Sequence, residues 1–251
     1  GSRCARRPYG LTAGCSYFLP GSPCARRLYG RSQPLAAQKT VSVALCDTRA
    51  PCEAAVYVSD SLPILPDRVS RIAMIARWKP VHLGHAAVLE ALADRAEHAI
   101  IGIGSSNKYD ASNPFTSEET AAMIRLVLAG RGNIELVDVP DLGHGPRWRA
   151  MVVGMFGPLD LFATANAYVR SLLEHDYRVV HPVWLIAPDR RVAVDGTMVR
   201  RRMARADDWR ALVPPSIAAF LDEHGLVDRF RREFGAQTIA LEEAEKKLEP
   251  S

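Results

Sequence analysis

Residues 72–92, IAMIARWKPVHLGHAAVLEAL, contain the change of pattern that decides the fold. The stretch from Ile72 to Ile75 is short and apolar and predicts a buried strand, whereas apolar residues recur at helical spacing from His85 onward. The residues expected on the buried face of that helix are Val88, Leu89, Leu92 and Ala96. The tetrad His82–His85 therefore lies in a turn that leads from a strand into a helix.

The two histidines of this turn are suited to binding phosphate. The first N–H groups of a helix lack backbone partners and the helix dipole adds positive charge, so polyphosphate binds there readily. Gly84 lets the backbone approach the ligand, and the imidazoles of His82 and His85 can donate hydrogen bonds or carry charge near neutral pH. The alternative is that one or both histidines pack or cap the helix. We predict a triphosphate site.

The rest of the chain alternates strands and helices. Further strands are predicted at residues 97–105, 133–139, 160–165 and 177–183, and helices at 116–129 and 146–156. Thr116 and Glu119 form a capping box, Gly130 closes that helix, and Pro146 suits a first helical turn. Such alternation predicts an α/β fold with a Rossmann-like parallel sheet flanked by helices, whose ligands gather beyond the carboxyl ends of the strands.

Three segments are expected along the chain. The sequence pattern predicts that residues 1–69 are an extension without a fold and that residues 70–235 form a single domain. Residues 236–251 are predicted to be a charged, frayed tail. Within the domain, the helical region from about Pro214 to Phe234 predicts a small C-terminal cap. The chain has no apolar stretch of membrane-spanning length.

The extension carries the unusual composition of this chain. Residues 1–70 hold nine Lys/Arg against four Asp/Glu, and the remainder holds 23 against 24. A nearly neutral domain lacks the positive face of a protein that tracks nucleic acid. All five cysteines precede residue 53, so no chemistry of the domain depends on a thiol. The nonapeptide at 2–10 recurs at 22–30, and the Arg-rich, acid-poor composition resembles a transit peptide; a segment that is not natively translated is the alternative.

Several motifs in a fixed order resemble one family. ARWKPVHLGH (76–85) is followed by residues 101–119, VPDLGHGPRW (139–148), TAN (164–166) and DGTMVRRRM (195–203). Together they resemble the nucleotidyltransferase superfamily, and within it the archaeal-type nicotinamide mononucleotide (NMN) adenylyltransferases, over roughly residues 70–225. An ordered set of motifs is far more specific than any one of them.

The resemblance implies roles for individual residues. His82 and His85 would hold the triphosphate, with His85 nearest the reacting α-phosphate, and Arg200 would act with them in catalysis. The other residues matched to ATP are Arg77, Gly84, Lys108, Asn166 and Thr197, and Trp148 would stack on the acceptor's flat ring. Lys108 as a solvated loop residue, Asn166 as a turn former and Trp148 as a core residue are the alternatives. Of the basic cluster Arg200, Arg201, Arg202 and Arg205, most are expected on a solvated face.

The chain departs from the family at several positions. Ala76, Trp78 and Lys79 replace Gly, Phe and Gln, and Thr120 replaces an Arg. Gly143 and His144 stand where the family has Asn and Arg, and Asp195 replaces a Ser where negative charge is awkward beside triphosphate. The triphosphate half of the site therefore matches better than the acceptor half.

The expected function is transfer of AMP from ATP to a mononucleotide phosphate, most simply NMN to give NAD, with pyrophosphate released. The alternatives are transfer, from ATP or CTP, to another phosphorylated acceptor, and an inactive nucleotide-binding regulator. Mg²⁺ would bridge the phosphates mostly with water, so no metal ligand is assigned to the protein. The expected partners are ATP and the acceptor, without nucleic acid or membrane, and the resembled family's rings imply a homo-oligomer. The expected location is the cytoplasm, or an organelle if residues 1–69 are a transit peptide.

Overall fold

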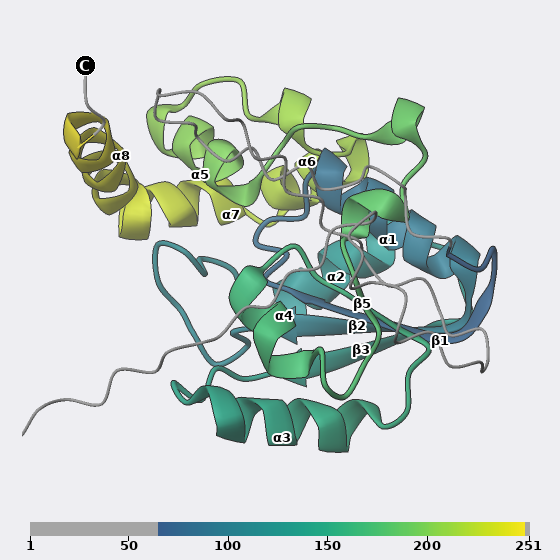
Figure 1. Cartoon of the computed structure of the whole chain (residues 1–251). Coiled ribbons are helices and arrows are strands. Elements are labelled where there is room, and N and C mark those ends of the chain that lie inside the picture. The colour runs from purple at the N-terminus through teal and green to yellow at the C-terminus, as the bar shows by residue number, and fades with distance from the viewer. Residues whose placement is uncertain (1–64, 249–251) are drawn as a thin grey trace, which may run out of the picture. The chain divides into compact units, whose positions relative to one another are not determined.

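Five parallel strands form one sheet in the part of the chain that the structure, a computed structural model, describes: residues 65–248 (Figure 1). The strands are β1 (Val69–Ala76), β2 (Ala96–Gly104), β3 (Ile134–Val139), β4 (Leu161–Ala163) and β5 (Val179–Val180). Their order is β3-β2-β1-β4-β5, and each pair of neighbours is parallel. The prediction of an α/β parallel sheet is confirmed.

Helices cover both faces of the sheet. They are α1 (Leu83–Arg95), α2 (Ser117–Val127), α3 (Gly145–Phe156), α4 (Ala167–Leu173), α5 (Gly196–Arg205), α6 (Pro215–Glu223), α7 (Leu226–Phe230) and α8 (Ala236–Leu248). Short turns of 3-10 helix are η2 (Pro182–Trp184), η3 (Pro188–Arg190) and η4 (Arg210–Leu212). In Figure 1, α3 runs along one side of the sheet, and α1, α2 and α6 lie on the other.

The two faces are built from alternating residues of each strand. On β1, Ile72 and Met74 join the core cluster shared with α1, α2 and the C-terminal helices. Ala73 belongs to the opposite cluster, which is completed by side chains of α3 and α4, and Ile75 packs against it. This alternation is the period-two geometry of a strand with both faces buried.

Several boundaries differ from the sequence prediction. Helix α1 ends at Arg95, and Ala96, which was expected on its buried face, is the first residue of β2. Helix α2 stops at Val127, two residues before the predicted end. The predicted strand 177–183 shortens to β5 because Pro182 has no N–H to donate to a ladder and starts η2 instead.

The prediction of a frayed tail is wrong for residues 236–248, which form helix α8. Glu242 and Glu245 of α8 pair with Arg205 and Arg201 of α5, and Figure 1 shows α8 following α7 on the same side of the sheet as α5. The chain also joins the domain earlier than expected, since Leu65 packs on the core and Arg95 donates to the Pro66 carbonyl at 2.7 Å. The nonapeptide repeat, the cysteines and the transit-peptide interpretation lie outside the described residues.

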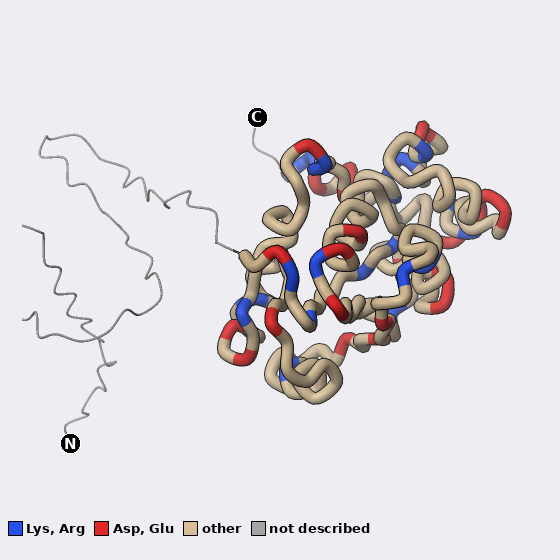
Figure 2. Tube along the Cα trace, turned by 90° about the vertical axis from the view of Figure 1, so that its right-hand side faces the viewer, with Lys and Arg blue, Asp and Glu red and all other residues tan. Residues whose placement is uncertain are grey.

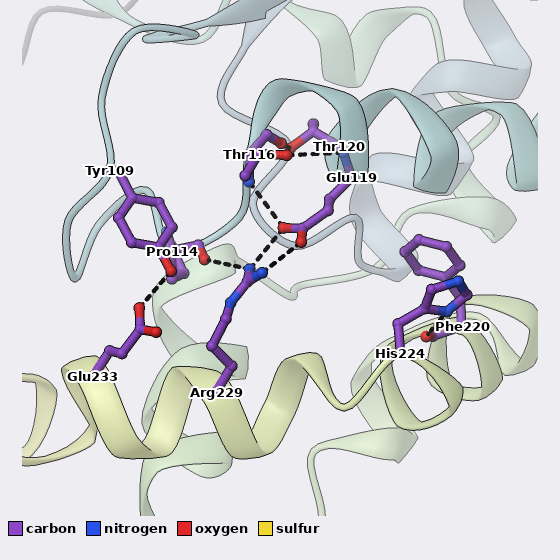
Figure 3. A network of polar contacts seen from close by, with 9 residues as sticks. All are labelled: Tyr109, Pro114, Thr116, Glu119, Thr120, Phe220, His224, Arg229 and Glu233. Carbon is purple, nitrogen blue, oxygen red and sulfur yellow. Dashed lines mark hydrogen bonds and ion pairs between the residues drawn. The ribbon is translucent and has the colours of Figure 1, made fainter.

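The C-terminal helices are tied to the start of α2 through Arg229 (Figure 3). Its guanidinium binds both carboxylate oxygens of Glu119, at 2.6 and 2.7 Å, and donates to the Pro114 carbonyl at 3.2 Å. Glu119 also accepts from the N–H of Thr116, so the predicted capping box is present. One arginine thus completes the N-terminus of α2 from a position 110 residues away in the chain.

Replacing Arg229 with alanine is expected to lower the free energy of unfolding by about 2 kcal/mol, because it leaves the half-buried Glu119 without its charged partner. Urea denaturation would measure the loss. Arg232→Ala, on the turn η5 (Arg231–Gly235), is the matched control because that residue is exposed. An Arg229→Ala protein as stable as the Arg232→Ala protein would contradict a stabilising role for the ion pair.

Charges of both signs are spread over the described part of the chain. Figure 2 shows Lys/Arg and Asp/Glu positions interspersed along the trace, without a broad stretch of one sign in this view. None of the helices described between residues 65 and 248 is long and apolar enough to cross a membrane.

Candidate active site

A cavity of about 1000 Å³ opens at the carboxyl ends of the strands. It is lined by the turn between β1 and α1, the end of β2, the start of α3, the segment from the end of β4 into α4, and the chain from η2 to the start of α5. The predicted site residues that line it are Arg77, His82, Gly84, His85, Trp148, Asn166, Thr197 and Arg200. Lys108 does not line it, because its side chain is exposed in the loop after β2.

The side chain of His82 caps helix α1. Its Nδ1 accepts a hydrogen bond from the N–H of His85 at 3.2 Å, which leaves the proton of the neutral ring on Nε2 as a donor. Burial lowers the pKa of His82 to about 4, so the ring is neutral near pH 7 in the free protein. Capping and lining of the cavity, which the sequence left as alternatives, occur in the same residue.

His85 lies between two aromatic rings. Its imidazole stacks on that of His82, with the ring centroids 3.6 Å apart. The centroid of the Trp78 indole lies 4.8 Å from the centroid of the His85 ring. Its Nδ1 is buried without a well-formed hydrogen bond to any of residues 65–248. Burial, followed by the neighbouring His82, holds the pKa of His85 well below its usual value. His82 can therefore meet a phosphate oxygen as a neutral donor from Nε2, and His85 can do the same in the tautomer that carries its proton on Nε2.

Trp78 packs against the His85 ring and helps to hold it in place. The residue is fully buried, has a φ of 56°, and donates from Nε1 to the Gly102 carbonyl at 2.9 Å. A Cβ atom at Gly102 would lie 2.7 Å from Ile75 Cγ1, so this part of β2 accepts only glycine without rearrangement. The position of His85 thus depends on the packing of β1 against β2 beside the cavity, where Ile75 and Trp78 are lining residues but Gly102 is not.

Glycine at position 84 is required by its neighbours as well as by any ligand. A Cβ atom there would lie 3.0 Å from the Val194 carbonyl oxygen and 3.3 Å from the His82 ring. The loop that leads to α5 consequently packs directly on the turn that starts α1. The N–H groups of Leu83 and Gly84 have no acceptor among the described residues, so they are free to bind phosphate oxygens.

The start of α5 brings a buried cation to the cavity. Arg200 is 8% exposed and donates to the Lys79 carbonyl at 2.9 Å and to Thr197 Oγ1 at 3.2 Å. Burial lowers the pKa of Arg200 to about 10, so the guanidinium remains charged at neutral pH. Within the basic cluster, Arg201, Arg202 and Arg205 instead contact Glu245, the Asp208 carbonyl and Glu242.

The presence of aspartate at position 195 is explained by its place at the start of helix α5. It is the N-cap of α5, and its Oδ1 accepts from the N–H of Met198 at 2.9 Å. Serine and aspartate are both favoured N-cap residues. Aspartate in place of serine therefore preserves the helix cap, and its Oδ1 is hydrogen-bonded to the backbone N–H of Met198.

The side of the cavity where the sequence predicts the acceptor is formed by the segment before α3. Gly143 has a φ of 62°, and His144 caps α3 by accepting from the N–H of Arg147 at 3.2 Å. Trp148 lines the cavity and also packs on the cluster below the sheet. At the start of the neighbouring helix α4, Asn166 lines the cavity while its Oδ1 caps that helix.

The sequence analysis missed Lys79 as a site residue. Its side chain is 1% exposed and lines the cavity, and its Nζ donates to the Ser105 carbonyl at 3.2 Å. Read from the sequence, Lys79 was only a departure from a family motif. A signal was present, however, because Lys79 is one of two basic residues, with Arg77, between the apolar strand and the histidine turn.

Comparisons with known proteins agree with this geometry. A family model described as cytidylyltransferase-like matches residues 74–202. A nicotinamide-nucleotide adenylyltransferase of Thermococcus kodakarensis is 33% identical over 188 residues, covering 72% of this chain and 95% of that protein. Another from Methanolobus tindarius is 32% identical over 162 residues, covering 62% and 90%.

Solved structures share the fold. A bifunctional NMN adenylyltransferase/ADP ribose pyrophosphatase from Francisella tularensis, complexed with AMP and a manganese ion, superimposes with a TM-score of 0.52 at 18% identity. The match covers 71% of this chain and 56% of that one, so the chain spans just over half the length of the Francisella protein.

Proposed function

Because this chain belongs to the cytidylyltransferase-like family of nucleotidyltransferases, we propose that it transfers the adenylyl group of ATP to NMN, forming NAD and releasing pyrophosphate. The single observation that carries the proposal is the convergence of His82 and His85 with Thr197 and Arg200 in one cavity. These two segments are more than 100 residues apart and contribute donors and a cation, the groups that stabilise a phosphoryl transition state.

The reaction needs little covalent chemistry from the protein. An oxygen of the acceptor phosphate forms a bond to the α-phosphorus of ATP, and the bond from that phosphorus to the β-phosphate oxygen breaks. The electron pair leaves with pyrophosphate, and no protein nucleophile takes part. Positioning and charge stabilisation therefore supply most of the rate enhancement.

The residues divide this work according to their places. His82 and His85 would donate to the triphosphate, with His85 nearest the α-phosphate, beside the free N–H groups at the start of α1. Arg200 and Thr197 would bind the β- and γ-phosphates at the start of α5, and Arg77 would contact phosphate from the exposed rim. Asn166 would contact the adenine side and Trp148 the nicotinamide ring. Lys108 would reach ATP only if its loop moved, because its side chain lies outside the cavity lining.

Mg²⁺ is the divalent ion that we propose for this reaction. Among residues 65–248, no group of three or more His, Cys, Asp or Glu side chains is arranged to hold a metal ion. Magnesium keeps several waters and is commonly held by substrate phosphates, which fits a cavity whose phosphate side presents mainly N–H donors and a guanidinium. When bound, the ion would neutralise charge on the β- and γ-phosphates.

The test is turnover of the purified protein with ATP, Mg²⁺ and a panel of mononucleotides, with a chelator as the control. Pyrophosphate and NAD are expected with NMN, and neither is expected when the metal is removed. Pyrophosphate formed only with another phosphorylated acceptor would favour a second candidate function, for which Gly143 and His144 are the reason. Binding of ATP without turnover across the panel would contradict both.

A further inference from the structure

Lys79 lines the cavity, and its ammonium group has unused hydrogen-bonding capacity beside Ser105, which lines the cavity as well. An ammonium has three N–H donors, and among the described residues only the Ser105 carbonyl accepts from this one. The side chain is nevertheless almost completely buried. Burying a cation is costly unless it is paired or fully hydrogen-bonded, so two free donors at this place point to a ligand.

The nearby carboxylates do not pair with this ammonium. Asp110 and Asp138 act on it only at a distance, and burial lowers the pKa of Lys79 despite them. Asp110 accepts instead from the N–H groups of Ser112 and Asn113 and from the Asn113 side chain. Asp138 binds Ser117. No carboxylate of residues 65–248 therefore forms an ion pair with Lys79, although Asp110 and Asp138 act on it from farther away.

The position of Lys79 indicates which anion would supply that charge. Its carbonyl holds Arg200, on the triphosphate side of the cavity, whereas its ammonium points to the end of β2. Beyond β2 in the sheet lies β3, which leads into the acceptor segment with His144 and Trp148. The ammonium thus lies at the junction of the two halves of the site.

We propose that Lys79 binds the phosphate of the acceptor nucleotide, the group whose oxygen attacks the α-phosphorus of ATP. This inference rests on the proposed function and extends it by assigning a residue to recognition of a phosphorylated acceptor. The lysine keeps its proton throughout the step, so the bonds made and broken are those already given. Its charge would hold the attacking phosphate close to ATP despite their mutual repulsion.

The test compares an acceptor with its dephosphorylated form. Dissociation constants of NMN and of nicotinamide riboside would be measured by calorimetry for the wild type and for Lys79→Met, with Lys247→Met as a control that removes an exposed lysine of α8. We expect Lys79→Met to weaken NMN binding by about 10- to 100-fold, the size of a charge-assisted hydrogen bond. Riboside binding and the KM for ATP should change less than about twofold, within the scatter of surface substitutions.

A merely structural lysine would give a different result. Equal weakening of NMN and riboside, or no weakening of either, would overturn the inference. If Lys79→Met does not fold, as judged by circular dichroism, Lys79→Gln keeps an amide donor without the charge and should show the same selective loss. A wild type that forms another dinucleotide would contradict NMN as the acceptor, and the same comparison would then be made with that acceptor and its nucleoside. If the wild-type protein neither catalyses transfer to any mononucleotide nor binds one, both proposals would be contradicted.

Discussion

A His85→Ala variant is expected to lose about 10² or more in kcat, with a smaller change in the KM for ATP. The imidazole lies at the turn where the reacting phosphorus would sit, and it is held there by the His82 and Trp78 rings. A donor positioned in advance stabilises charge that develops only in the transition state, so its removal affects kcat more than binding. Steady-state kinetics with saturating NMN would measure the loss.

The control for this variant is His175→Ala, because His175 is exposed in the connection between α4 and β5. His85→Asn would keep an N–H donor on a shorter side chain and should retain part of the activity. If His85→Ala turned over as fast as His175→Ala, the role assigned to the second histidine of the turn would be excluded.

Replacing Arg200 with alanine is expected to lower kcat/KM for ATP by about 10² to 10³. The guanidinium joins two parts of the site, since it contacts Thr197 of its own helix α5 and the Lys79 carbonyl before α1 while Arg200 lines the cavity. Its burial makes the charge strong toward phosphate, because little water screens it. Removing the side chain also leaves the Lys79 carbonyl without its donor.

Two further variants separate charge from geometry at this position. Arg200→Lys keeps a cation but cannot reproduce the planar fork, and should fall between the wild type and Arg200→Ala. Arg202→Ala, on the same helix but exposed and bonded to the Asp208 carbonyl, is the matched control. A kcat/KM for Arg200→Ala within twofold of the Arg202→Ala value would rule out contact between Arg200 and the triphosphate.

Local patterns in the sequence predicted most of the domain. The strand–turn–helix passage at the histidines, the capping box at Thr116 and the helix that begins near Pro146 are all present. The end of α1 was misplaced because Ala96 passes from helix to strand without a glycine or proline to mark the change. Helix α8 was missed because its ion pairs with α5 are tertiary contacts, which a charged sequence read alone does not reveal.

The candidate site shows the same division. Residues in recognisable motifs, such as His82 and Thr197, line one cavity. The orientation of a flexible side chain was not predictable, so the sequence did not show that Lys79 is buried at the cavity and that Lys108 is exposed away from it. A motif fixes where a backbone turns, whereas the packing of distant segments decides which of two lysines points inward.

The lack of space for a side chain at Gly102 limits which substitutions this protein can tolerate. Any side chain there would displace Ile75 and, through the hydrogen bond to Trp78, the indole against which His85 rests. In a library of random variants selected for turnover, position 102 should therefore be as intolerant as the histidines themselves, although no nucleotide reaches it. We expect substitutions at residues that hold the imidazoles in place to reduce activity as much as substitutions at residues that contact the substrate.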